Sequence, residues 1–144
     1  MCGIVGYLGN KDAKDVIIKG LKRLEYRGYD SAGISTLQNN KLEITKTQGK
    51  VSDLKGFLTD NSHLGGLGIG HTRWATHGSP NYLNAHPHRD NSGKFSLVHN
   101  GIIENYNSLK QLLKDNGITC KTDTDTEVLV QFISYLYQKE KLDF

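Results

Sequence analysis

Cysteine, proline and long apolar runs are all scarce in this sequence. Its 144 residues include two cysteines, Cys2 and Cys120, and two prolines. Two cysteines cannot build a disulfide framework, and the chain is long enough for one domain with a hydrophobic core. We expect Cys120 to be a buried or half-buried thiol. No apolar stretch approaches the roughly 20 residues that a membrane-spanning helix needs, so we expect no membrane partner.

A concentrated block of charge of one sign is missing as well. The formal net charge is +3, and lysine and arginine are scattered among aspartate and glutamate. Nucleic-acid-binding proteins usually carry a concentrated basic face. Residues 1–6 lack the basic start of a secretory signal, and Lys11 and Asp12 follow too soon for its apolar core. We therefore expect a cytoplasmic protein that binds no nucleic acid.

Hydrophobic periodicity and turn residues divide the chain into short strands and helices. Strands are predicted at residues 3–8, 32–37, 42–47, 67–72 and 95–99, and helices at residues 12–26, 51–58, 107–116 and 124–136. Asn39 and Asn40 favour a hairpin turn because asparagine tolerates positive φ. The glycines of the fourth strand indicate close backbone approach, and residues 73–90 have the composition of a loop. The mixture predicts an α+β fold with a largely antiparallel sheet.

The last predicted helix has the clearest signals. Thr124 and Glu127 have the spacing of a capping box, in which each side chain bonds the backbone N–H of the other residue. An apolar stripe follows at helical spacing, which we expect to face the core. Its members are Val128, Leu129, Phe132, Ile133 and Leu136.

The position of Cys2 carries chemical meaning. Methionine aminopeptidases act when the second residue is small, so removal of Met1 would leave Cys2 at the N-terminus. A thiol needs a base to become a nucleophilic thiolate. A free α-amino group has a pKa of about 7.7–8.0 and can serve as that base near neutral pH. The alternative is that Cys2 is a small buried side chain in the first strand.

Four further segments supply groups that amide hydrolysis requires, and in one of them, residues 23–33, Arg27 can support a site. Arg73 can grip a carboxylate through two parallel hydrogen bonds, or form a surface ion pair. The Asn100 amide and the Gly101 N–H can stabilise an oxyanion, or form a plain turn. Asp125 can bind a substrate ammonium group, or supply first-turn charge to the last helix.

Together these segments resemble the class II glutamine amidotransferases, whose glutaminase domains are N-terminal nucleophile hydrolases. The likeness runs from Cys2-Gly3-Ile4-Val5-Gly6 to the last predicted helix. It implies an αββα four-layer sandwich, incomplete in this chain. Within the class, residues 23–33, 71–78, 85–88 and 99–105 resemble the branch that makes glucosamine-6-phosphate from fructose-6-phosphate. The resemblance then implies that residues 1–144 are the N-terminal portion of the glutaminase domain, that the sugar-isomerase domains lie outside them, and that the full-length protein is a homodimer.

The resemblance also implies a role for each matching residue. Cys2 would form a γ-glutamyl thioester, with its own α-amino group as base and then as acid for the departing ammonia. Asn100 and Gly101 would form the oxyanion hole. Arg73 and Asp125 would hold the α-carboxylate and the α-ammonium group of glutamine.

Four more positions match the family. Thr76 and His77 are implied to line the glutamine pocket, and Trp74 to gate ammonia transfer toward the synthase half. Arg27 is implied to support the segment around Cys2. The resemblance implies no cofactor.

Other interpretations remain open at this stage. The histidines invite a metal hypothesis, but aspartate and glutamate are not well spaced beside them, and we expect no metal. The chain could belong to another class II amidotransferase with a different acceptor. It could also be a piece that binds glutamine without turning it over.

Overall fold

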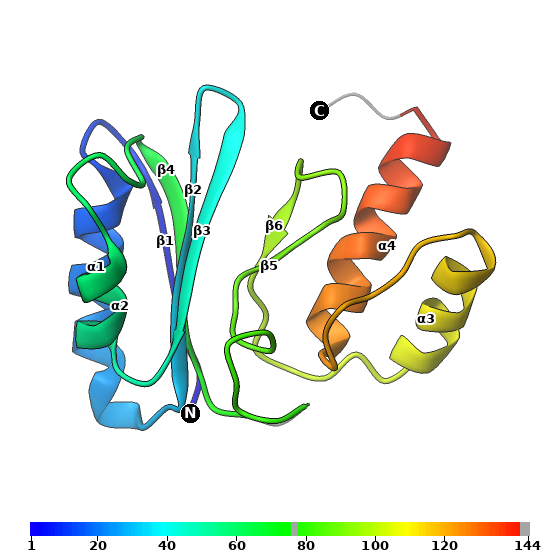
Figure 1. Cartoon of the computed structure of the whole chain (residues 1–144), viewed down its shortest axis with the longest axis horizontal. Helices are drawn as coiled ribbons and strands as arrows, with labels where there is room; N and C mark the ends of the chain where they lie inside the picture. The colour runs from blue at the N-terminus through cyan, green and yellow to red at the C-terminus, as the bar shows by residue number, and fades with distance from the viewer. Residues whose placement is uncertain (76–77, 142–144) are drawn as a thin grey trace.

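Secondary structure is arranged in four layers in the computed structural model, which describes residues 1–75 and 78–141 (Figure 1). In chain order the elements are β1 (Gly3–Leu8), α1 (Ala13–Leu24), η1 (Glu25–Arg27), β2 (Ser31–Gln38), β3 (Lys41–Gln48), α2 (Val51–Phe57), β4 (Leu67–Arg73), β5 (His88–Arg89), β6 (Ser96–Leu97), α3 (Tyr106–Asp115) and α4 (Asp125–Lys139). Helices α1 and α2 cover one face of a sheet built from β1 to β4. Strands β5 and β6 lie beyond its other face, followed by α4 and α3. The predicted α+β class and layer order are confirmed.

The four-stranded sheet has the order β1-β4-β2-β3, and every neighbouring pair is antiparallel. Gly3 at the start of β1 pairs with Thr72 near the end of β4. This register brings Cys2, just before β1, to the same sheet edge as Arg73, the last residue of β4. The sheet therefore joins two predicted site residues that are 71 positions apart in the sequence.

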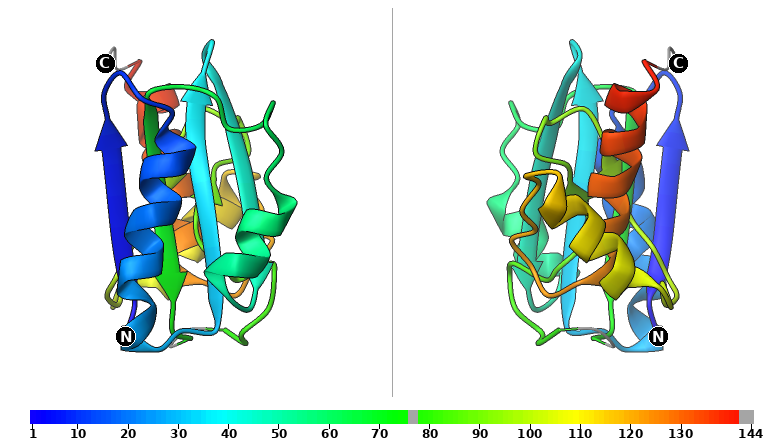
Figure 2. Two further views of the ribbon diagram at one scale, coloured as in Figure 1. Left: turned by 90° about the vertical axis from the view of Figure 1, so that its left-hand side faces the viewer. Right: turned by 90° about the vertical axis from the view of Figure 1, so that its right-hand side faces the viewer.

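The core lies between this sheet and the helices that cover it. Ile17 and Leu21 of α1 are fully buried, as are Ile34 of β2 and Leu54 of α2. Figure 2 shows α1 lying along the sheet face and α2 beside it. Gly70 of β4 permits this contact, because a Cβ there would lie 2.3 Å from the Cγ2 atom of Ile17. The close backbone approach expected for this strand is confirmed.

The turn of the predicted hairpin is confirmed in detail. Asn39 and Asn40 have φ values of 50° and 60°, and Gln38 pairs with Lys41 across them. Positive φ at both central residues gives the turn a twist that matches the twist of the flanking strands.

Three predicted elements differ from those observed. The helix expected over residues 12–26 ends at Leu24 and continues as the 3-10 turn η1. The strand expected at residues 95–99 shrinks to Ser96–Leu97, because its partner β5 offers only two residues for pairing. Strand β5 itself lies inside the segment expected to be a loop, and two residues are too short for a periodic signal.

The capping box predicted for α4 is half correct. The Thr124 hydroxyl accepts from the Glu127 N–H at 3.2 Å. The Glu127 carboxylate instead accepts from the backbone N–H groups of Lys121, at 2.8 Å, and of Thr122, at 2.6 Å. The backbone N–H groups of the residues before α4 therefore bond to the Glu127 carboxylate. In a complete capping box the Thr124 N–H would occupy that position.

The apolar stripe predicted for α4 is only partly buried. Val128 is 1% exposed, whereas the other four members are half-buried. Polar residues occupy much of the fully buried face, because they bond to the loop after β5. Gln131 accepts from the Asn91 N–H at 3.0 Å, and Ser134 donates to the Asp90 carboxylate at 2.8 Å. Within the described ranges, none of the helices combines the length and the apolar character needed to cross a bilayer.

We expect Gly33→Ala to destabilise the fold. A Cβ at Gly33 would lie 2.0 Å from the carbonyl oxygen of His86, which belongs to the layer behind β2. Backbone must move to admit it, so urea unfolding should show a loss of about 2–3 kcal/mol. Gly56→Ala is the matched control, since its Cβ meets nothing within 4 Å and alanine favours the helix by about 1 kcal/mol. Equal stability of the two variants would contradict the packing described for Gly33.

Candidate active site

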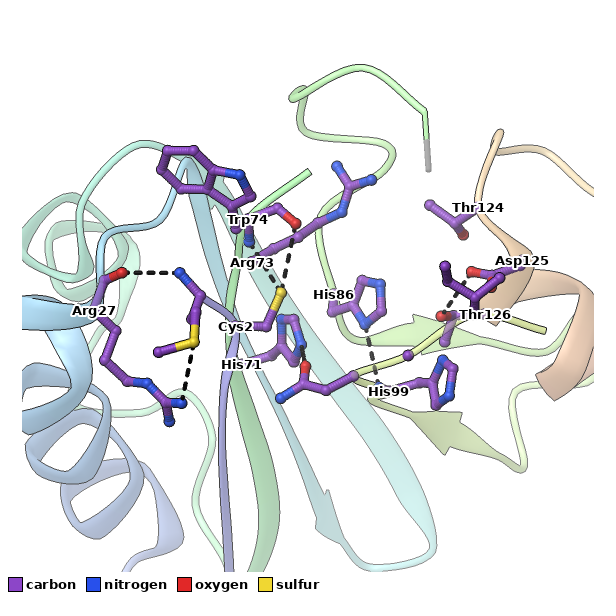
Figure 3. A pocket seen from close by; sticks show the side chains of 14 residues that line it. Cys2, Arg27, His71, Arg73, Trp74, His86, His99, Thr124, Asp125 and Thr126 are labelled. Carbon is purple, nitrogen blue, oxygen red and sulfur yellow. Dashed lines mark hydrogen bonds between the residues drawn. The ribbon is translucent and has the colours of Figure 1, made fainter. Parts of the chain in front are cut away.

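One cavity of about 500 Å³ gathers most of the predicted site residues (Figure 3). Its lining includes Cys2, Arg27, Arg73, Trp74, Asn100, Gly101 and Asp125. The other two predicted residues, Thr76 and His77, lie outside the described residues. The lining comes from the start of β1, the turn η1, the end of β4, the segment after β6 and the start of α4.

Cys2 faces this cavity and is half-buried. The backbone N–H of Trp74 donates to the Cys2 sulfur at 3.1 Å, and the thiol lies 3.5 Å from the Trp74 carbonyl oxygen. The alternative interpretation of Cys2 as a buried core side chain is therefore wrong.

Met1 lines the same cavity. Its α-amino group donates to the carbonyl oxygens of Arg27, at 2.8 Å, and Gly28, at 3.0 Å. The Arg27 guanidinium also contacts the Met1 sulfur at 3.9 Å. While Met1 is attached, the nitrogen of Cys2 is an amide and has no basic lone pair. The sequence analysis did not identify the Gly28 carbonyl as a partner of the Met1 amino group.

Arg73 and Asp125 bring opposite charges to the cavity, and each is 3% exposed. Arg73 donates to the carbonyl oxygens of Gly78 and Ser79, both at 3.3 Å. Burial lowers the pKa of Arg73, while the nearby negative groups, Asp30 foremost, oppose that shift. Because Arg73 is buried, its alternative interpretation as a surface ion pair is wrong.

Asp125 is held by the segment that carries Asn100. Its Oδ2 atom accepts from the Ile103 N–H at 2.8 Å, and it is the first residue of α4. Both interpretations offered for Asp125 are therefore compatible with its position, since it supplies first-turn charge and also lines the cavity. A buried carboxylate and a buried guanidinium that line one cavity suit a ligand that carries both an ammonium group and a carboxylate.

Three buried histidines form a cluster at the cavity, and two of them, His71 and His86, belong to its lining. The rings of His71 and His86 are stacked with centroids 4.3 Å apart, and His88 meets His86 edge-on at 4.7 Å. His71 contacts Asn100 at 2.6 Å, and His88 contacts the Thr124 hydroxyl at 3.0 Å. Among residues 1–75 and 78–141, no group of histidine, cysteine and carboxylate side chains is placed to hold a metal ion.

Burial keeps these histidines neutral. It lowers the pKa of His71 to about 4 and that of His88 to about 3, and it lowers the pKa of His86 as well. The sequence analysis considered these residues only as metal ligands. Their clustering on a strand end and the following loop was the available signal that they belong near the site.

We expect the protein to lose stability as the pH falls from about 6.5 to about 4. In this window the unfolded chain protonates histidines that the folded chain keeps neutral, so folding becomes less favourable as the pH drops. Each such histidine contributes about 1.4 kcal/mol per pH unit. Urea unfolding at about pH 7 and about pH 5 measures the difference. His88→Gln should reduce the slope by about one proton, and a flat profile in the unsubstituted protein would contradict neutral buried histidines.

Comparison with known proteins identifies the family. The glutamine amidotransferase domain family matches residues 41–140. The chain is 56% identical over 144 residues to glutamine–fructose-6-phosphate aminotransferase (isomerizing) of Bacteroides thetaiotaomicron, with 99% of this chain and 24% of that protein covered. It is 51% identical over 143 residues to the enzyme of the same name from Clostridium perfringens, covering 99% and 23%. The chain thus spans about a quarter of the length of these curated relatives.

Two solved structures share the fold. Glutamine phosphoribosylpyrophosphate amidotransferase from B. subtilis matches with a TM-score of 0.73 and 32% identity, covering 93% of this chain and 29% of that one. A structure described as the allosteric regulatory enzyme of purine biosynthesis matches with a TM-score of 0.78 and 31% identity, covering 100% and 30%. These neighbours have the N-terminal nucleophile hydrolase fold, as expected for this chain. The chain belongs to the glutamine amidotransferase domain family.

Proposed function

We propose that residues 1–144 are the N-terminal portion of a glutaminase domain, in which Cys2, once freed of Met1, attacks the side-chain amide of glutamine. The observation that carries this proposal is the convergence of Cys2, Arg73, Asn100 and Asp125 on one cavity. These residues come from four separate segments of the chain. Together they offer a nucleophile, an oxyanion donor and two opposite charges.

The chemical steps follow from the groups present. The α-amino group of Cys2 takes the thiol proton, and the sulfur attacks the carbonyl carbon of the glutamine side chain. The Asn100 side-chain NH₂ and the Gly101 N–H stabilise the oxyanion of the tetrahedral intermediate. As the intermediate collapses, the carbon–nitrogen bond breaks, and the ammonium group of Cys2 returns its proton to the departing ammonia. Water then cleaves the γ-glutamyl thioester and releases glutamate with the free thiol.

Substrate selection rests on Arg73 and Asp125. The guanidinium pairs with the α-carboxylate of glutamine and the carboxylate with its α-ammonium group. Both side chains are buried, so each pair forms where water competes little. Thr76 and His77 complete the pocket in this proposal, and Arg27 supports the N-terminal segment through its carbonyl.

We further propose that the ammonia is delivered to fructose-6-phosphate in the full-length protein. The support is the higher identity to the fructose-6-phosphate enzymes, 51% and 56%, than to the phosphoribosylpyrophosphate enzyme, 32%. Trp74 is 54% exposed and lines the cavity, which suits a gate for ammonia. The homodimer, the cytoplasmic location and the lack of nucleic-acid and membrane partners stay predictions.

The test is the intact mass of the protein before and after incubation with a diazoketone analogue of glutamine. We expect loss of Met1 and one covalent adduct, which Cys2→Ala abolishes. Cys120→Ala is the matched control and keeps the adduct, because burial raises the pKa of the Cys120 thiol to about 11 and leaves it unreactive. Saturable glutamine binding without an adduct would instead support a binding piece without turnover. An adduct on Cys120 alone would refute the role given to Cys2.

A further inference from the structure

His71 forms a hydrogen bond with the Asn100 side chain. Its Nε2 atom lies 2.6 Å from the Asn100 Oδ1 atom (Figure 3). His71 is fully buried in β4, where it pairs with Ile4 of β1 and Gly33 of β2. The backbone of His71 is therefore held by strand pairing on both sides, and its side chain is held by burial. Asn100, in contrast, is exposed in a segment without regular structure.

The protonation of His71 makes it a hydrogen-bond donor to Asn100. With its pKa lowered to about 4 by burial, against the opposing effect of the Asn100 bond, the ring is neutral near pH 7 and carries one N–H. The Nδ1 atom is buried and has no hydrogen-bond partner in the described residues. A carbonyl oxygen can only accept, so the proton belongs on Nε2.

This bond determines which way the Asn100 amide faces. The oxygen and the NH₂ group of an amide project in different directions from the same carbon, so holding Oδ1 against His71 turns Nδ2 away from the ring. A rotation of the amide by half a turn would place NH₂ hydrogens against the Nε2–H of His71. His99, the residue before Asn100, is held by the stacked pair of His71 and His86, because its N–H donates to His86 Nδ1 at 3.4 Å.

We propose that His71 is a positioning residue, whose Nε2–H holds the Asn100 amide with its NH₂ group turned toward the oxyanion that forms during attack by Cys2. The inference rests on the proposed glutaminase function. It adds a residue that lines the cavity and acts through Asn100. Oxyanion stabilisation exists only in the transition state, so the effect of losing His71 falls on kcat rather than KM.

Two substitutions of His71 separate the hydrogen bond from the space that the ring fills. In His71→Gln the side-chain nitrogen reaches about as far as Nε2, so a donor to Asn100 is retained. In His71→Asn the nitrogen lies near the Nδ1 position and cannot reach. We expect His71→Asn to lower kcat for glutamate release by about 10- to 100-fold with KM nearly unchanged. His71→Gln should stay within about threefold of the unsubstituted protein.

A double-mutant cycle distinguishes positioning from a structural role. Asn100→Ala removes the group through which His71 acts, so adding His71→Asn to it should cost less than about threefold in kcat. A purely structural role would lower kcat by the same factor in both backgrounds. Should His71→Asn fail to fold in urea titrations, His71→Leu suits the buried site, also lacks the donor, and should show the same loss of kcat.

These experiments distinguish failure of the role given to His71 from failure of the proposed glutaminase function. A Met1-processed, unsubstituted protein that releases no glutamate would overturn both proposals. An active protein whose His71→Asn and His71→Leu variants keep full kcat would overturn the role of His71 alone. Equal losses in His71→Gln and His71→Asn, or additive losses with Asn100→Ala, would also overturn it.

Discussion

Protein that retains Met1 should release no glutamate from glutamine. The Met1 backbone turns the Cys2 amine into an amide, which removes the base that the thiol needs. General base catalysis alone contributes about 10²- to 10⁴-fold. Met1 also lines the cavity where glutamine would bind, with its α-amino group bonded to the carbonyl oxygens of Arg27 and Gly28. Both effects act in the same direction, so we expect activity below detection.

The measurement uses one preparation in two states. Protein is produced while methionine aminopeptidase is inhibited, and one half is then treated with purified aminopeptidase. Glutamate release should appear in proportion to the fraction of chains whose mass has fallen by one methionine residue. Cys2→Ala protein taken through the same treatment should stay inactive. Turnover by chains that still carry Met1 would show that the base is another group.

Asp125→Asn should raise KM for glutamine by about 100-fold and change kcat little. Asparagine keeps the shape of the side chain and an oxygen that accepts from the Ile103 N–H, so the local fold should survive. The charge is lost from a site that is 3% exposed, where an ammonium group without its partner is costly. The expected split between KM and kcat reflects contacts that exist equally in the bound substrate and in the transition state.

Asp123→Asn is the matched control for this substitution. Asp123 lies two residues earlier, is exposed, and does not line the cavity. Steady-state glutamate release should give a KM within about twofold of the unsubstituted protein. Equal KM values for the two variants would place the ammonium site elsewhere.

Local signals in the sequence determined much of the secondary structure. The Asn39-Asn40 turn, the strand at residues 3–8 and the helix after Thr124 each depend on neighbouring residues, whose propensities act regardless of the rest of the fold. The family resemblance added the site residues. It did so through residue identities at fixed spacing, and seven of those residues line one cavity in the structure.

Only the tertiary structure determined the contacts between segments that are far apart in the sequence. The register of β1 against β4 brings Cys2 beside Trp74, and the loop before α4 takes the Glu127 carboxylate away from its expected partner. The histidines look alike in the sequence, yet burial at the cavity makes three of them neutral, and the fold gives one of them a contact to Asn100. Burial and hydrogen-bond partners depend on strand pairing and on contacts between residues far apart in the chain, and these are not encoded in local propensity.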